Sequence, residues 1–162
     1  MKLLLTLLLV LNVPCAIAAD TQPFVRGSYQ KLVSERADQP FILSFWSLTC
    51  TYCLEDLPLF AKLLKKYSLN MVMVATDTPE HHLEITRTLQ LNKLERAESW
   101  VFADKFTDRL RYEVDKQWHG ELPRTYYFSA NGQIVALSGK LDMAQTELWI
   151  QQQEQIMKAR KP

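Results

Sequence analysis

The feature that most constrains the fold is an apolar run, residues 41–46, which leads through a short polar loop to two cysteines, Cys50 and Cys53. The run holds aromatic and β-branched residues, a composition typical of a strand that is buried on both faces. A helical pattern begins at the cysteines. Residues i and i+3 of a first helical turn lie on one face, so the two sulfur atoms can reach disulfide distance. The stretch therefore predicts a buried strand, a loop and a helix whose first turn carries two thiols.

The two thiols are expected to differ in reactivity. Cys50 would lie at the helix N-terminus, where unpaired backbone N–H groups and the helix dipole favour the thiolate, the form that attacks disulfides. Cys53 would lie one turn deeper and be more buried, which suits it to resolve a mixed disulfide. The pair predicts a catalytic dithiol that needs no bound cofactor.

This stretch resembles the active site of the thioredoxin superfamily, whose pattern is a strand, a tryptophan (here Trp46), three residues, Cys-x-x-Cys and a helix. The resemblance includes Pro58, five residues after the second cysteine. It is closest to the exported TlpA-like, or ResA-like, thiol-disulfide oxidoreductases, in which a glutamate stands at the position of Asp56. Trp46 is expected to pack over the thiols and shield them rather than to stack on a substrate.

A second motif of this resemblance lies near the C-terminal hairpin, at Leu122 and Pro123. Proline cannot donate to a sheet ladder, so Pro123 is expected at the start of the strand that follows it. In thioredoxin-like folds the equivalent proline is cis and packs against the Cys-x-x-Cys pair. A cis bond would expose the backbone of Leu122 for pairing with an extended segment of the substrate. We also expect Arg124 to favour the Cys50 thiolate, to meet an acidic partner, or to be an ordinary solvated side chain.

The resemblance also implies an acid that assists proton transfer from the second cysteine. Many thioredoxins place it two residues before the tryptophan, where this chain has Ser44. Exported relatives tend to place an acid after the next strand, which makes Asp77 or Glu80 the substitute. For Glu80, a carboxylate in the first turn of a helix is the equal alternative.

The direction of electron flow depends on the surroundings of the thiols. The residues between the cysteines, Thr51 and Tyr52, match neither the Gly-Pro of reducing thioredoxins nor the Pro-His of strongly oxidising relatives. Neither residue brings positive charge, whereas Glu55 and Asp56 bring negative charge that opposes thiolate formation. These residues favour a reductase over a disulfide-forming oxidant.

Residues 1–19 predict a cleaved secretory signal, with a retained membrane anchor as the alternative. A basic Lys2 precedes an apolar stretch too short to span a bilayer comfortably, and small residues at Ala18 and Ala19 suit a peptidase. Cys15 lacks the small preceding residues of a lipoprotein cysteine, so it would be lost on maturation. The remaining chain, residues 20–162, is expected to form one domain in the periplasm, where disulfide exchange can occur.

Charge and ligand patterns argue against other kinds of partner. Lys2 is the only charged residue of the leader, so its removal leaves as many basic residues as the 18 acidic ones. A balanced chain has no field to recruit nucleic acid or an anionic membrane, and a monomer is expected. His81 and His82 are adjacent and would point to different sides of a helix, so no metal site is expected there. His119 is expected to be an ordinary loop histidine.

The rest of the chain alternates helical and strand patterns. A helix after the thiols should turn Leu54, Leu57, Ala61 and Leu64 toward the core. Strands are expected at residues 71–75, 100–103, 126–128 and 134–137, the last two joined by an Asn-Gly turn. A helix from residue 79 to 91 should turn Leu83, Ile85 and Leu89 inward, and one from 105 to 114 should turn in Phe106, Leu110 and Val114.

This order predicts an α/β fold with a mixed sheet flanked by helices. It resembles a thioredoxin-like fold with the central insertion of TlpA-like members. The resemblance implies an exported reductase of protein disulfides, for example in cytochrome c or metalloprotein maturation, recharged by a membrane thiol-disulfide interchange protein. The alternatives are a disulfide-forming oxidant, a copper-binding chaperone-like module that uses both thiols as soft ligands, and a non-catalytic interaction domain.

Overall fold

A mixed sheet of six strands forms the centre of the computed structural model, which describes residues 21–160. The expected leader, including Ala18 and Ala19, lies outside these residues. The strands lie side by side in the order β1-β4-β3-β2-β5-β6, and the first four are mutually parallel. β5 runs antiparallel to both β2 and β6. The strands are β1 (Gln22–Phe24), β2 (Phe41–Trp46), β3 (Asn70–Ala75), β4 (Glu98–Phe102), β5 (Arg124–Phe128) and β6 (Ile134–Ser138).

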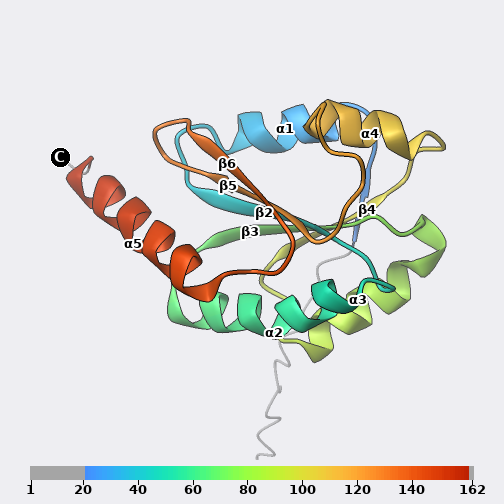
Figure 1. Ribbon diagram of the computed structural model, residues 1–162, viewed down its shortest axis with the longest axis horizontal. Coiled ribbons are helices and arrows are strands. Elements are labelled where there is room, and N and C mark those ends of the chain that lie inside the picture. The colour runs from blue at the N-terminus through green and yellow to red at the C-terminus, as the bar shows by residue number, and fades with distance from the viewer. Residues whose placement is uncertain (1–20, 161–162) are drawn as a thin grey trace, which may run out of the picture.

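Helices cover both faces of the sheet, as Figure 1 shows. One face carries α1 and α4, and the opposite face carries α2, α3 and α5. A short 3₁₀ turn, η1, immediately precedes α3. The helical elements are α1 (Ser28–Glu35), α2 (Thr51–Lys66), η1 (Pro79–His81), α3 (His82–Leu91), α4 (Thr107–Val114) and α5 (Met143–Ala159). The predicted α/β class and flanked mixed sheet are confirmed.

Strand β2 is buried along its whole length because both of its faces are covered. Phe41, Leu43 and Phe45 enter the apolar cluster beneath α1 and α4, whereas Ile42 and Trp46 enter the cluster beneath α2 and α3. Successive strand residues point to opposite faces of a sheet, so a doubly covered central strand favours apolar residues at successive positions; in β2 only Ser44 departs from this pattern.

The core-facing side of α2 differs from the predicted stripe. Leu57 and Leu64 are buried as expected, but Leu54 is exposed and Ala61 only half-buried. Phe60 and Leu63 take their place in the core. The buried face of the helix is therefore rotated toward the positions that follow Cys53 at steps of three and four residues.

The segment between β3 and the terminal hairpin contains the predicted extra strand and helix. β4 lies between β1 and β3, so the first strand of the chain pairs with β4 rather than with β3. Ile85 and Leu89 are buried as expected, whereas Leu83 is exposed. In α4, Leu110 and Val114 are buried, but Phe106 precedes the helix and is exposed.

The chain ends in the predicted hairpin and a long capped helix. Asp142 caps α5 by accepting a hydrogen bond from the backbone N–H of Gln145 at 3.0 Å. None of the helices within residues 21–160 combines the length and the apolar character needed to cross a membrane.

Candidate active site

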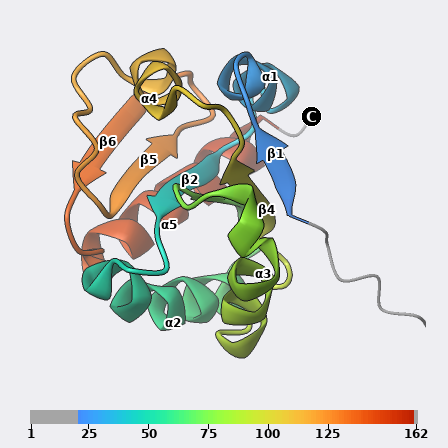
Figure 2. The ribbon, with the colours of Figure 1, turned by 90° about the vertical axis from the view of Figure 1, so that its right-hand side faces the viewer.

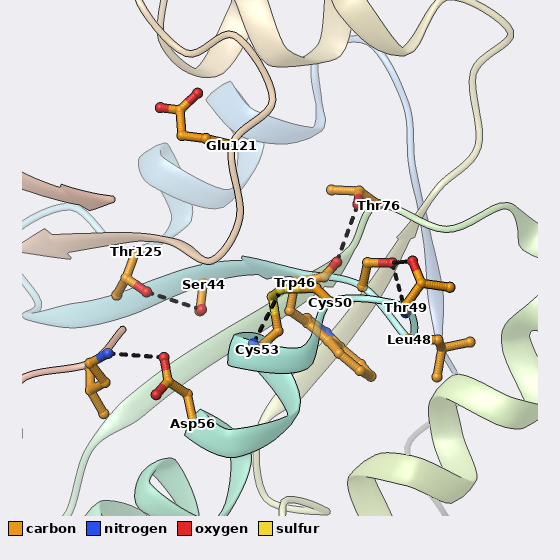
Figure 3. Close-up of a disulfide and its surroundings, with 12 residues drawn as sticks. Ser44, Trp46, Leu48, Thr49, Cys50, Cys53, Asp56, Thr76, Glu121 and Thr125 are labelled. Atoms are coloured by element: carbon orange, nitrogen blue, oxygen red, sulfur yellow. Dashed lines mark hydrogen bonds between the residues drawn. A yellow bond between two sulfur atoms is a disulfide. The ribbon is translucent and has the colours of Figure 1, made fainter. Parts of the chain in front are cut away.

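Cys50 and Cys53 form a disulfide with an S–S distance of 2.04 Å and a Cα–Cα distance of 5.2 Å. Cys50 is the N-cap residue of α2, and its Sγ accepts a hydrogen bond from the backbone N–H of Cys53 at 3.2 Å (Figure 3). Cys53 is only 1% exposed, whereas Cys50 is partly exposed. The expected asymmetry is present: the first sulfur is open to attack at a helix N-terminus, and the second is buried behind it.

Trp46 ends strand β2 and belongs to the buried cluster that contains Cys53 and borders Cys50. Its backbone carbonyl accepts hydrogen bonds from the backbone N–H of Thr76 at 2.8 Å and from the Thr76 hydroxyl at 3.3 Å. Its indole Nε1 has no hydrogen-bond partner in the described part of the chain. The side chain is placed to pack beneath the thiols, and Thr76 fixes the backbone from which their loop departs.

The Leu122–Pro123 peptide bond is cis, and Pro123 is buried. Phe45 of β2 pairs with Arg124 of β5, so Pro123 lies one residue further along, beside the end of β2 that leads to the cysteines. Leu122 is half-buried and packs against the same cluster as Cys50. Two motifs about 70 residues apart in sequence thus meet at one end of the sheet, because β2 and β5 are paired neighbours.

The residues between the cysteines face solvent. Thr51 is exposed, and Tyr52 is 57% exposed. The Nζ atom of Lys140 lies 5.7 Å from the centre of the Tyr52 ring and 2.5 Å from a carboxylate oxygen of Glu55. The negative charge of Glu55 is therefore shared with a cation on the rim of the site, which the sequence pattern did not reveal.

The two acids suggested after β3 have different surroundings. Asp77 accepts hydrogen bonds from the Ser47 hydroxyl at 3.0 Å and from the backbone N–H of Leu48 at 3.1 Å, so it holds the loop before Cys50. Glu80 is exposed in η1, and hydrogen bonds from the Thr78 hydroxyl and from its own backbone N–H lower its pKa. Glu80 is thus placed as an ordinary carboxylate in the first turn of a helix. Asp77 is placed to hold the loop that precedes Cys50.

Asp56 is the buried acid of the site, and its burial was not anticipated. It is 2% exposed and lies one turn after Cys53 on the buried face of α2. One carboxylate oxygen accepts a hydrogen bond from the backbone N–H of Leu141 at 2.9 Å, and the other has no partner among residues 21–160 (Figure 3). Burial raises the pKa of the Asp56 carboxyl, an effect that the Leu141 N–H and the Lys140 charge partly offset. The i, i+3 spacing from Cys53 was the signal available in the sequence.

The position of the acid in many thioredoxins is occupied by a neutral pair of hydroxyls. Ser44 and Thr125 are both buried, and their hydroxyl oxygens lie 3.1 Å apart across strands β2 and β5. Neither hydroxyl can act as a carboxylate acid. The buried carboxylate of the site is instead that of Asp56, on the helix that carries the cysteines.

Arg124, directly after Pro123, belongs to an internal polar network. Its guanidinium lies 2.6 Å from a carboxylate oxygen of Asp115 and 3.6 Å from one of Glu121, and it donates to the hydroxyl of Tyr126 at 3.0 Å. Burial raises the pKa of Tyr126 to about 12. The acidic partner expected for Arg124 is thus intramolecular, and the solvated alternative is wrong because the Arg124 side chain is only 12% exposed.

The side chain of Trp118, which the sequence did not single out, supports the loop that leads to Pro123. Its ring lies 4.6 Å from that of Phe45, and its indole N–H donates to the carbonyl of Glu121 at 2.9 Å. His81, His82 and His119 are exposed. Residues 21–160 contain no group of three or more His, Cys, Asp or Glu side chains arranged to hold a metal ion.

Comparisons with known proteins give structural neighbours. No protein-family model and no curated protein matches the chain. A secreted disulfide oxidoreductase of Mycobacterium tuberculosis, described as homologous to Escherichia coli DsbE, is 13% identical, with a TM-score of 0.58 over 74% of this chain and 85% of that one. A thioredoxin-family thiol:disulfide interchange protein of Chlorobium tepidum is 13% identical, with a TM-score of 0.59 over 74% and 83%. The exposed lipoprotein thioredoxin Etrx1 of Streptococcus pneumoniae is 14% identical, with a TM-score of 0.53 over 74% and 88%.

These likenesses establish the fold. The backbones of these neighbours superpose on about three quarters of this chain, although only 13–14% of the residues are identical. The chain therefore has a thioredoxin-like fold, with a Cys50–Cys53 disulfide at the N-terminus of α2.

Proposed function

We propose that the protein is an exported, TlpA-like thiol-disulfide oxidoreductase that reduces disulfide bonds in protein substrates. One observation carries this proposal. A partly exposed Cys50 is bonded to a buried Cys53 at the start of α2, at the end of the sheet where the cis-Pro123 precedes β5.

The reaction begins with the reduced dithiol. The Cys50 thiolate attacks one sulfur of a substrate disulfide, which forms a mixed disulfide and releases the other substrate sulfur as a thiolate. Cys53 then loses its proton and attacks Cys50. This step forms the Cys50–Cys53 disulfide and releases the second substrate thiolate, so two electrons pass to the substrate.

Asp56 is the group we propose to accept the proton from Cys53. Its carboxyl is buried one turn beyond Cys53 on the same face of α2, and one of its oxygens is free of protein partners among the described residues. Burial raises the pKa of this carboxyl, so its proton affinity lies closer to that of a thiol than the affinity of an exposed aspartate does.

The backbone at Leu122 is the proposed docking point for the substrate. It precedes the buried Pro123 and packs on the cluster that borders Cys50. An extended segment of the substrate could pair with this backbone while its disulfide lies over Cys50. Thr51 and Tyr52 would then contact the substrate on the exposed side of the cysteine loop.

Export and the reducing direction are further parts of the proposal. The leader pattern of residues 1–19 supports export, and two structural neighbours are described as secreted or exposed. Asp56, buried one turn after Cys53, brings negative potential near the thiols and so destabilises a thiolate there. A strong oxidant needs a stabilised thiolate, so this arrangement favours a reductase. In the periplasm a membrane thiol-disulfide interchange protein would return the chain to the dithiol state, for substrates such as apocytochrome c or a metalloprotein.

Insulin reduction with dithiothreitol as the electron source tests the activity. The purified protein should accelerate insulin precipitation, and Cys50→Ser should abolish the acceleration. A measured reduction potential near that of reducing thioredoxins, about −270 mV, supports the reductase, whereas a value near −120 mV indicates an oxidant. Tight Cu(I) binding without turnover would indicate the copper-binding alternative instead.

A further inference from the structure

A basic groove lies between α2 and the end of α3, away from the disulfide. Its volume is about 530 Å³, within the range of ligand-binding clefts. The two helices run side by side on one face of the sheet (Figures 1 and 2). The groove is lined by Pro58, Ala61, Lys62, Leu64, Lys65, Leu91, Asn92, Lys93 and Arg96.

The groove combines an apolar floor with a basic rim. Pro58, Ala61, Lys62 and Lys65 follow one another at helical steps of three, one and three, so they form a single stripe along α2. Leu91, at the end of α3, is 73% exposed and faces this groove without a covering side chain in the described chain. A single exposed leucine is ordinary, but here it lines a hollow together with four cations.

The four cations of the rim, Lys62, Lys65, Lys93 and Arg96, have no carboxylate within 4.0 Å in the described part of the chain, and no acidic residue lines the groove. By contrast, Lys66 on the adjacent face of α2 pairs with Glu147 at 2.9 Å. In a chain with nearly equal numbers of acids and bases, four unpaired cations around one hollow are a local concentration of positive charge.

The α2 dipole explains part of this pattern. Lys65 lies in the last turn, where a cation is stabilised by the helix C-terminus, and Arg96 donates to the carbonyl of Leu64 at 3.1 Å. The dipole does not account for Lys93, which belongs to the segment after α3, or for Lys62 one turn earlier. The charge comes from two separate segments that converge on one hollow.

We propose that this groove binds an acidic segment with interspersed apolar side chains on a protein partner of the dithiol. The inference rests on the proposed function. The carboxylates would pair with the rim, and the apolar side chains would cover Leu91, Pro58 and Ala61. A groove of this shape suits a chain segment better than a flat, anionic bilayer. Lys62 lies nine residues after Cys53, or about 14 Å along the helix, so one partner can reach both the groove and the cysteines.

The test measures binding without any thiol chemistry. The oxidised protein is titrated against a fluorescein-labelled peptide, Glu-Leu-Asp-Glu-Phe-Leu-Glu, at 50 mM salt, and anisotropy is recorded. We expect saturable binding that weakens at 500 mM salt, and no binding of the same peptide with lysine at each acidic position. Lys62→Glu/Lys65→Glu should weaken binding at least tenfold.

A charge-matched control separates the groove from net charge. Lys105→Glu/Lys158→Glu makes the same change in charge at exposed positions outside the groove, and its affinity should stay within twofold of the wild type. Equal weakening in both variants, no peptide binding, or preferential binding to phosphatidylglycerol vesicles would overturn the inference. Insulin reduction without peptide binding contradicts the groove alone, whereas peptide binding without insulin reduction contradicts only the proposed enzyme activity.

Discussion

The carboxylate of Asp56 accepts a hydrogen bond from the backbone N–H of Leu141 at 2.9 Å. This contact ties the helix that carries both cysteines to the loop between β6 and α5, 85 residues away in sequence. On the rim, Lys140 pairs with Glu55, so two consecutive residues of the loop engage two consecutive residues of α2. The buried Asp56–Leu141 hydrogen bond holds the helix in place. The exposed Glu55–Lys140 pair adds little to the stability of the fold because solvent screens its charges.

Replacing Asp56 with asparagine should stabilise the oxidised protein at neutral pH. The folded-state pKa of Asp56 is raised, so the native state binds more protons than the unfolded state above the ordinary aspartate pKa, and stability falls as pH rises through that interval. The asparagine amide would stay neutral, and its carbonyl could keep the Leu141 hydrogen bond. We expect a gain of about 1 kcal/mol at pH 7 that disappears near pH 3. Urea unfolding at both pH values measures it, and a loss at pH 7 would contradict the buried charge.

Replacing Cys53 with serine should trap the reaction halfway. Cys50 remains accessible and can attack a substrate disulfide, but the buried group that would release it is gone. Incubation with intact, disulfide-bonded insulin should give a mixed disulfide that is visible on a non-reducing gel and located at Cys50 by mass spectrometry. The matched Cys50→Ser variant should form far less of this adduct. Equal adduct from both variants would mean that the roles of the cysteines are not divided as proposed.

Replacing Asp77 with alanine should loosen the loop before the cysteines. The change removes the acceptor of both the Ser47 hydroxyl and the Leu48 backbone N–H. We expect a loss of about 1–2 kcal/mol in unfolding free energy and a lower kcat/KM for insulin. Glu80→Ala is the control, because the loss of this exposed side chain should leave the unfolding free energy almost unchanged. A larger effect on kcat/KM from Glu80→Ala would restore Glu80 as the assisting acid.

Replacing Arg124 with methionine should destabilise the strand that follows Pro123. The variant leaves Asp115 and the Tyr126 hydroxyl without their shared cation at a largely buried position. We expect a cost of about 3 kcal/mol, the usual scale for a buried pair that loses one partner. Lys31→Met removes an exposed pair with Glu35 and should cost less than about 0.5 kcal/mol. Comparable losses from the two variants in chemical denaturation would show that the Arg124 network does not hold the loop.

Sequence reasoning succeeded where a local pattern was sufficient. The apolar run of β2 and the Asn-Gly turn depend on near neighbours in the chain, and each is found in the structure. It failed at Leu54 and Phe106, which stand near the ends of their helices. Leu54 follows the buried Cys53 but lies on the exposed side of α2, and Phe106 is the exposed N-cap residue of α4, outside the helix itself.

The sequence by itself determined the dithiol, the strand and helix that carry it, and the order of elements, because these follow from side-chain periodicity and residue chemistry over a few turns. Only the tertiary structure decided which distant groups surround the thiols. Pairing of β2 with β5 brings the cis-Pro123 to the end of the cysteine strand. Packing of the Leu141 loop on α2 buries Asp56, and the same folding encloses Arg124 among Asp115, Glu121 and Tyr126. Burial and charge pairing depend on contacts between residues that are far apart in the chain, and no local pattern specifies them.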